Sequence, residues 1–245
     1  MRAITERKIL NHKSLFIVSL VSLSLFSQTL QKEIPQYFQE HIAQQKSVSI
    51  EKENFKDYDF SKILADEHTD FIGYIGKDYQ RLYIKFDDVK RNSEFEYLVS
   101  GSSIVKGRSL KFQGKMQVID IKKFINLDYG ADDFMLGKVK EQGLMLAKYL
   151  FTEDEKRPAS GLFEGYALVK WYKDAQNKPL YDDIDEDSDS YANNQFLGTW
   201  KSYKAKISKP CSWGHYRIPQ SGDLDIGAAE FSPNSKYFKN GWGEF

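Results

Sequence analysis

The chain has 245 residues, and its 35 Lys and Arg balance 35 Asp and Glu. It therefore has no overall positive field to attract nucleic acid, and we expect no nucleic-acid partner. The length suffices for one β-rich domain with a self-sufficient core. Aromatic residues make up 15% of the chain, with 17 Phe and 15 Tyr, a composition that favours strands and can line a cavity.

Residues 1–27 have the pattern of a signal peptide. Four basic residues precede the apolar run 15–26, and small side chains near Ser24 or Ser27 suit cleavage. The run is shorter than the roughly 20 residues needed to span a bilayer, so we expect removal and no transmembrane span afterwards. The mature protein is expected to be exported, to the periplasm or the cell exterior. Its single cysteine, Cys211, cannot form an internal disulfide.

Residues 28–69 predict a lead-in with short helices. A second helix is expected after Asp59 or Ser61, either of which can cap its first turn. The first helix is indicated by residues at helical spacing, namely Ile34, Tyr37, Phe38, His41 and Ile42.

One five-residue pattern, Phe-x-Gly-x-apolar, occurs four times in the middle of the chain. In a strand, residues two apart share a face, so each copy places its Phe, its Gly and its last apolar residue on one side. A glycine inside a strand marks a bulge, a corner or a close backbone approach, and a closed sheet needs such points. The four copies, residues 71–75, 112–116, 163–167 and 196–200, therefore predict a strongly curved antiparallel sheet.

The strand pattern continues to residue 204, with mostly hairpin-length connections. Within residues 110–121 the apolar alternation slips at Ile119, which indicates a bulge. The acidic run 182–189 predicts an exposed loop, and the Gly- and Pro-rich end from Lys209 predicts coil and short strands that wrap the sheet. The predicted strands are residues 71–75, 81–89, 94–99, 110–121, 143–151, 161–172 and 195–204.

Seven or eight such strands predict an all-β domain over residues 70–245, as an antiparallel up-and-down barrel or a strongly bent sheet. The step Gly198-Thr199-Trp200 resembles the G-x-W signature of lipocalin-like (calycin) barrels. That resemblance implies a calyx for small apolar ligands, although the family carries the motif in its first strand and this chain carries it late. The leader is typical of an exported bacterial protein. An outer-membrane barrel is disfavoured because the residues before Phe245 do not alternate.

The repeat also supplies the candidate ligand-binding residues. We expect a non-catalytic binding or envelope-associated module whose partner is a small apolar or aromatic ligand, or a cell-envelope component. A completely filled core would instead favour a purely structural interaction domain. The predicted ligand-binding residues are Phe71, Phe112, Phe163, Phe196 and Trp200.

Residue types that support catalysis occur near the C-terminus, so a secreted hydrolase is the alternative. Cys211 and His215 could form a thiolate–imidazole pair. Asp223 and Asp225 could provide the two carboxylates of a glycosidase, if about 5 to 9.5 Å apart. No established catalytic motif surrounds either pair. A small buried thiol beside a hydrogen-bonded histidine, and acidic turn formers, are the ordinary structural explanations.

The acidic run supplies the candidate metal ligands. An EF-hand is excluded because Ser188 stands where its loop needs glycine and Asn194 where it needs glutamate. We predict no cofactor and at most weak calcium binding, at about 10⁻⁴ to 10⁻³ M. The candidate ligands are Asp183, Asp185, Asp187 and Asp189.

Overall fold

The computed structural model describes residues 33–243, so the predicted signal peptide lies outside the described residues. The described residues from Tyr37 onward belong to one compact unit, which contains every strand described below. Within the described range, no helix has the length and apolar character needed to cross a bilayer.

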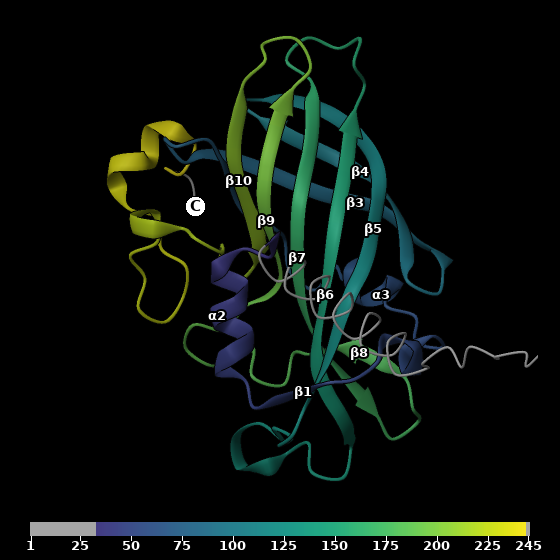
Figure 1. Ribbon diagram of the computed structural model, residues 1–245. Coiled ribbons are helices and arrows are strands. Elements are labelled where there is room, and N and C mark those ends of the chain that lie inside the picture. Colours follow the sequence, from purple (N-terminus) through teal and green to yellow (C-terminus); the bar gives the residue numbers. More distant parts are fainter. Residues whose placement is uncertain (1–32, 244–245) are drawn as a thin grey trace, which may run out of the picture. The chain divides into compact units, whose positions relative to one another are not determined.

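Eight antiparallel strands form a closed ring that is not a regular barrel (Figure 1). Neighbouring strands in the ring follow one another along the chain, and β10 pairs with β2 to close it. This confirms the predicted all-β, up-and-down architecture. The ring strands are β2 (Ile72–Ile75), β3 (Gln80–Ser93), β4 (Glu96–Val105), β5 (Arg108–Phe124), β6 (Val139–Glu153), β7 (Gly161–Asp174), β9 (Asn193–Ser202) and β10 (Ser208–His215).

Short elements precede and interrupt the ring. The predicted lead-in helices are present as α2 (Gln36–Gln44) and α3 (Ser61–Leu64), and the Asp59 carboxylate accepts a hydrogen bond from the Ser61 amide at 2.9 Å. Strand β1 (Ser47–Ser49) pairs with β5, and β8 (Pro179–Tyr181) pairs with β7. The 3-10 helices are η1 (Lys52–Phe55), η2 (Ala131–Asp133), η3 (Gly222–Leu224) and η4 (Ser235–Asn240).

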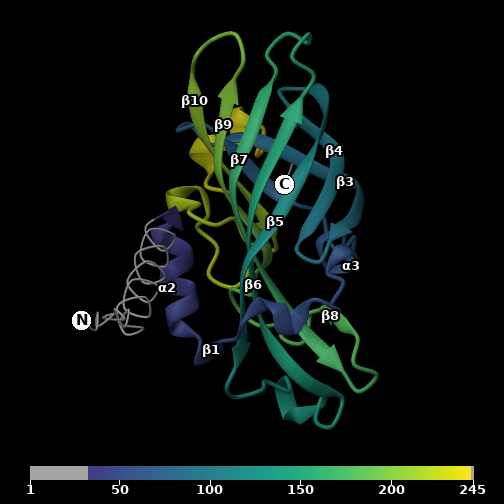
Figure 2. The ribbon, with the colours of Figure 1, turned by 45° about the vertical axis from the view of Figure 1, so that its right-hand side comes forward.

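Alternate connections of an up-and-down ring lie at the same end. Figures 1 and 2 show the β6–β7 and β9–β10 loops at one end and β8 at the other. The β2–β3 and β4–β5 connections belong to the first end by the same alternation. We call this end the mouth.

Aromatic side chains fill most of the ring's interior. Phe112 stacks on Phe151 with ring centroids 5.2 Å apart, and Phe196 stacks on Trp213 at 5.0 Å. All four rings are buried. Such offset stacking adds to the free energy gained by burying the rings.

Glycines in the wall make room for these rings. Gly73 stands directly opposite Trp213 in the strand pairing, and Gly165 stands opposite Tyr149. A Cβ at Gly73 would lie 2.7 Å from the Trp213 Cβ, and one at Gly165 would lie 2.8 Å from the Tyr149 hydroxyl. The repeat glycines therefore permit close approach of a neighbour, which is one of the roles expected of glycine in a strand.

The register shifts that mark bulges lie elsewhere in the sheet. One falls between Val118 and Asp120, which confirms the predicted bulge in β5. The stretch from Lys209, predicted as coil and short strands, ends in turns and 3-10 helices, but it begins inside the strand that closes the ring, β10. Its pairing with β2 and β9 outweighs the turn-forming tendency of Pro210 and Gly214.

The acidic run is only partly exposed, contrary to prediction. Asp182 and Ile184 are buried, whereas residues 187–189 are exposed. The Asp182 carbonyl accepts hydrogen bonds from the Tyr191 hydroxyl and, at 3.2 Å, from the Asn193 amide. These contacts draw the start of the run inward, and burial raises the pKa of the Asp182 carboxyl to about 6.

Candidate functional site

The filled interior leaves space at the mouth, where a pocket of about 280 Å³ is present. We call it the mouth pocket. Its volume is near the lower end of the range for small-molecule sites, about 300 to 1,000 Å³. Its apolar walls consist of Ile75, Val105, Leu110, Phe163 and Trp200.

One buried carboxylate, that of Glu153, also lines the mouth pocket. Its Oε1 accepts a hydrogen bond from the Ser103 hydroxyl at 2.6 Å. Its Oε2 accepts two more, from the Gly161 amide at 2.8 Å and from the Trp200 indole Nε1 at 3.2 Å. Three neutral donors therefore satisfy a carboxylate that burial would otherwise penalise.

The same contacts fix the orientation of Trp200. Its indole donates to Glu153, and its ring lies so close to Gly161 that a Cβ there would be 2.7 Å from Cε2. Phe163 is its direct neighbour across the β7–β9 pair. The wall of the mouth pocket is therefore preorganised by neighbours on three strands, β6, β7 and β9.

The rim of the mouth pocket is basic. Lys106, Arg108 and Lys209 line it and are exposed. Arg108 Nη1 donates to the Pro158 carbonyl at 3.0 Å, and Lys209 Nζ lies 5.8 Å from the centroid of the Trp200 ring. Three cations thus surround an apolar entrance.

Two of the five predicted ligand-binding residues, Phe163 and Trp200, line the mouth pocket. Phe112 and Phe196 lie in the filled interior, and Phe71 borders a separate pocket of about 200 Å³ beside α3. Glu153 was not predicted, because it follows the predicted strand 143–151 in the chain. A signal was present, because Glu153 continues the inward alternation of Tyr149 and Phe151 along β6.

The structure does not bring Cys211 and His215 together. They lie four residues apart on β10, about 13 Å along an extended strand, with buried Trp213 between them. His215 Nδ1 is hydrogen-bonded to the Tyr181 hydroxyl at 3.1 Å. Burial, with a smaller contribution from His68, lowers the pKa of His215 to about 3. Burial raises the pKa of the Cys211 thiol well above its usual value, so neither group is activated.

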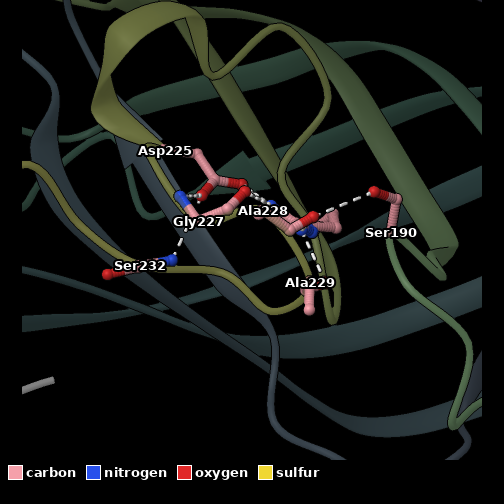
Figure 3. A network of polar contacts seen from close by, with 7 residues as sticks. Ser190, Asp225, Gly227, Ala228, Ala229 and Ser232 are labelled. Carbon is pink, nitrogen blue, oxygen red and sulfur yellow. Dashed lines mark hydrogen bonds and ion pairs between the residues drawn. The ribbon is translucent and has the colours of Figure 1, made fainter.

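Asp225 is held in a polar network with backbone groups of the C-terminal segment (Figure 3) and with Arg217. Arg217 Nη1 lies 2.5 Å from Asp225 Oδ2, and the two side chains are 14% and 7% exposed. Arg217 also donates to three backbone carbonyls, and Asp225 Oδ1 accepts from two backbone amides. These backbone groups belong to Gly227, Ala228, Ala229 and Ser232.

Asp223 is bound by different partners from those of Asp225. Its carboxylate is exposed, forms an ion pair with Lys236 and accepts a hydrogen bond from the Tyr237 hydroxyl at 2.7 Å. The two aspartates therefore stabilise separate parts of the C-terminal segment. This arrangement gives no support to a glycosidase pair.

The calcium prediction remains a prediction. Across residues 33–243, no three His, Cys, Asp or Glu side chains are placed together to hold a metal ion. Asp187 and Asp189 border a pocket of about 460 Å³. Asp183 and Asp185 do not border that pocket, and burial raises the pKa of both.

Comparisons with protein-family models, with curated proteins and with solved structures give no significant match. The proposals that follow therefore rest on this chain's own geometry.

Proposed function

We propose that this protein is a non-catalytic binding module that takes a small apolar or aromatic ligand into the mouth pocket. The observation that carries the proposal is the position of the pocket. Aromatic rings fill the ring's interior, and at its mouth space remains in front of the apolar wall formed by Phe163 and Trp200. Mostly apolar walls with a few placed polar groups are typical of small-molecule sites.

The fixed orientation of Trp200 supports the same proposal. A wall whose aromatic ring is already held by Glu153 and Gly161 loses little conformational entropy when a ligand packs against it. Trp200 also belongs to the step that resembles the lipocalin-like signature. From the leader pattern we further propose that the mature protein acts in the periplasm or outside the cell. Recovery of the uncleaved chain from the cytoplasm alone would contradict that.

A hydrolase is less well supported by the geometry. The thiol and imidazole of β10 are separated by Trp213, and each C-terminal aspartate already binds its own cation. The mouth pocket, by contrast, offers a space whose walls have no other evident use.

The test is a fluorescence titration with N-phenyl-1-naphthylamine, an uncharged aromatic probe. We expect one site per chain, and we expect Val105→Trp, which fills the mouth pocket, to weaken binding by about tenfold or more, equivalent to about 1.4 kcal/mol. Leu98→Trp is the matched control, because Leu98 lies on the same strand, is exposed and does not line the pocket. Equal binding by the two variants, or no binding by the unmodified protein, would overturn the proposal.

A further inference from the structure

We propose that the ligand of the mouth pocket is an amphipathic anion, with an apolar body between the walls and one anionic group at the rim. This inference rests on the proposed function and specifies its ligand class. It comes from the distribution of charge over the ring and from the burial of Glu153, whose carboxylate already accepts three hydrogen bonds.

The chain is neutral overall, yet its charges are divided between the two ends of the ring. The mouth loops carry six basic and three acidic residues, whereas the loops of the opposite end carry two basic and ten acidic residues. The mouth loops are residues 76–79, 106–107, 154–160 and 203–207, and the opposite loops are 94–95, 125–138, 175–178 and 182–192. Such a division favours the approach of an anion to the mouth.

The lining of the mouth pocket also has more basic than acidic residues. Its lining includes three cations, Lys106, Arg108 and Lys209, and one acid, Glu153. The acid is buried, and its oxygens already accept three hydrogen bonds from the protein. A ligand that enters therefore meets exposed positive charge first, and a cationic ligand would have to pass that rim to reach an acceptor already in use.

The rim cations can hold an anion without leaving water. Arg108 uses Nη1 on the Pro158 carbonyl, which leaves most of the five guanidinium N–H donors available. Lys209 carries its ammonium near the Trp200 ring, above the apolar wall. An anionic group at this position avoids the desolvation cost of a buried charge, while the body of the ligand packs against Phe163 and Trp200.

Two probes that differ by one group test this inference. 8-Anilino-1-naphthalenesulfonate is N-phenyl-1-naphthylamine with an added sulfonate. Because exposed ion pairs each change an equilibrium constant by roughly two- to fivefold, we expect the sulfonate to bind about tenfold more tightly at low salt. The difference should shrink at 1 M salt, where the Debye length is about 3 Å.

The variant Lys106→Gln/Arg108→Gln/Lys209→Gln should remove this difference, because it lowers the affinity for the sulfonate probe more than the affinity for the uncharged probe. The matched control, Lys77→Gln/Lys204→Gln/Lys206→Gln, removes three cations from the mouth loops that do not line the pocket. We expect it to retain most of the difference.

Three results would overturn the inference. The first is that the two probes bind the unmodified protein with equal affinity. The second is that the rim variant loses equal affinity for both probes. The third is that the control variant removes the difference in affinity as fully as the rim variant does. If the uncharged probe still binds and Val105→Trp still blocks it, the proposed function survives these results. If the uncharged probe does not bind at all, both proposals fail.

Discussion

Glu153 at the mouth and Asp225 in the C-terminal segment are both carboxylates with buried side chains, yet their surroundings differ. Asp225 is paired with Arg217, which also binds three carbonyls of the same loop. Glu153 is held by three neutral donors and borders a mostly apolar pocket. The comparison teaches that a buried acid indicates a binding site only when its neighbours leave space for a ligand. The C-terminal aspartates secure the fold, and Glu153 positions a pocket wall.

The largest expected effect concerns the ion pair between Arg217 and Asp225 in the C-terminal segment. Arg217→Ala should lower the free energy of unfolding by about 4 kcal/mol, because it leaves the buried Asp225 carboxylate without its cation. Urea denaturation measures this change. Binding of the uncharged probe at the mouth should be unaffected.

Arg217→Lys is the matched variant. It keeps a positive charge near Asp225 but cannot reproduce the forked contacts to the loop carbonyls. We therefore expect it to lower the free energy of unfolding by less than Arg217→Ala does. A change below about 1 kcal/mol in Arg217→Ala would mean that the network does not secure this segment.

The second effect concerns the pH dependence of stability and tests whether His215 is a neutral structural group. The folded protein lowers its pKa to about 3, while the unfolded chain protonates near 6.5. The unfolded state therefore binds more protons between these values, and stability falls as pH is lowered through them. From pH 7 to pH 4 we expect a loss of about 3 kcal/mol from this group.

His215→Phe removes this titration and keeps a ring packed against Phe71, whose centroid lies 4.2 Å from the imidazole. The measured quantity is the difference between the two proteins in unfolding free energy at each pH. Asp182, whose raised pKa has the opposite effect between about pH 3.8 and 6, is present in both and cancels. A difference that does not change with pH would show that His215 does not titrate as described.

The smallest of the three effects concerns Glu153. Glu153→Ala removes the acceptor for three donors, but water in the pocket can replace part of it. We therefore expect a loss of about 2 kcal/mol in unfolding free energy, together with weaker probe binding because Trp200 is no longer oriented. Glu153→Gln retains an acceptor, so it should lose less unfolding free energy and less affinity for the probe than Glu153→Ala. Unchanged binding in Glu153→Ala would contradict the positioning role.

Much of the fold follows from local sequence. The Phe-x-Gly-x-apolar repeat predicted which residues face inward, because strand alternation depends only on neighbours along the chain. The closure of the ring was harder to predict from the sequence. It depends on β10, whose proline and glycine favour turns locally and whose strand conformation comes from long-range pairing with β2 and β9.

The candidate site was predicted in part. Phe163 and Trp200 came from the repeat, but Glu153 begins a charged stretch that resembles a surface link. Its burial depends on Trp200 and Ser103, which lie far away in sequence. Cys211 and His215 fall in the stretch predicted as coil and short strands, whereas one extended strand holds the two groups apart.

The most direct test of the mouth pocket is a crystal structure of the protein with N-phenyl-1-naphthylamine bound. We predict that the naphthyl ring packs against Phe163 and Trp200 and that no probe occupies this position in Val105→Trp. A probe bound only elsewhere on the protein, with Phe163 and Trp200 uncovered, would contradict the account.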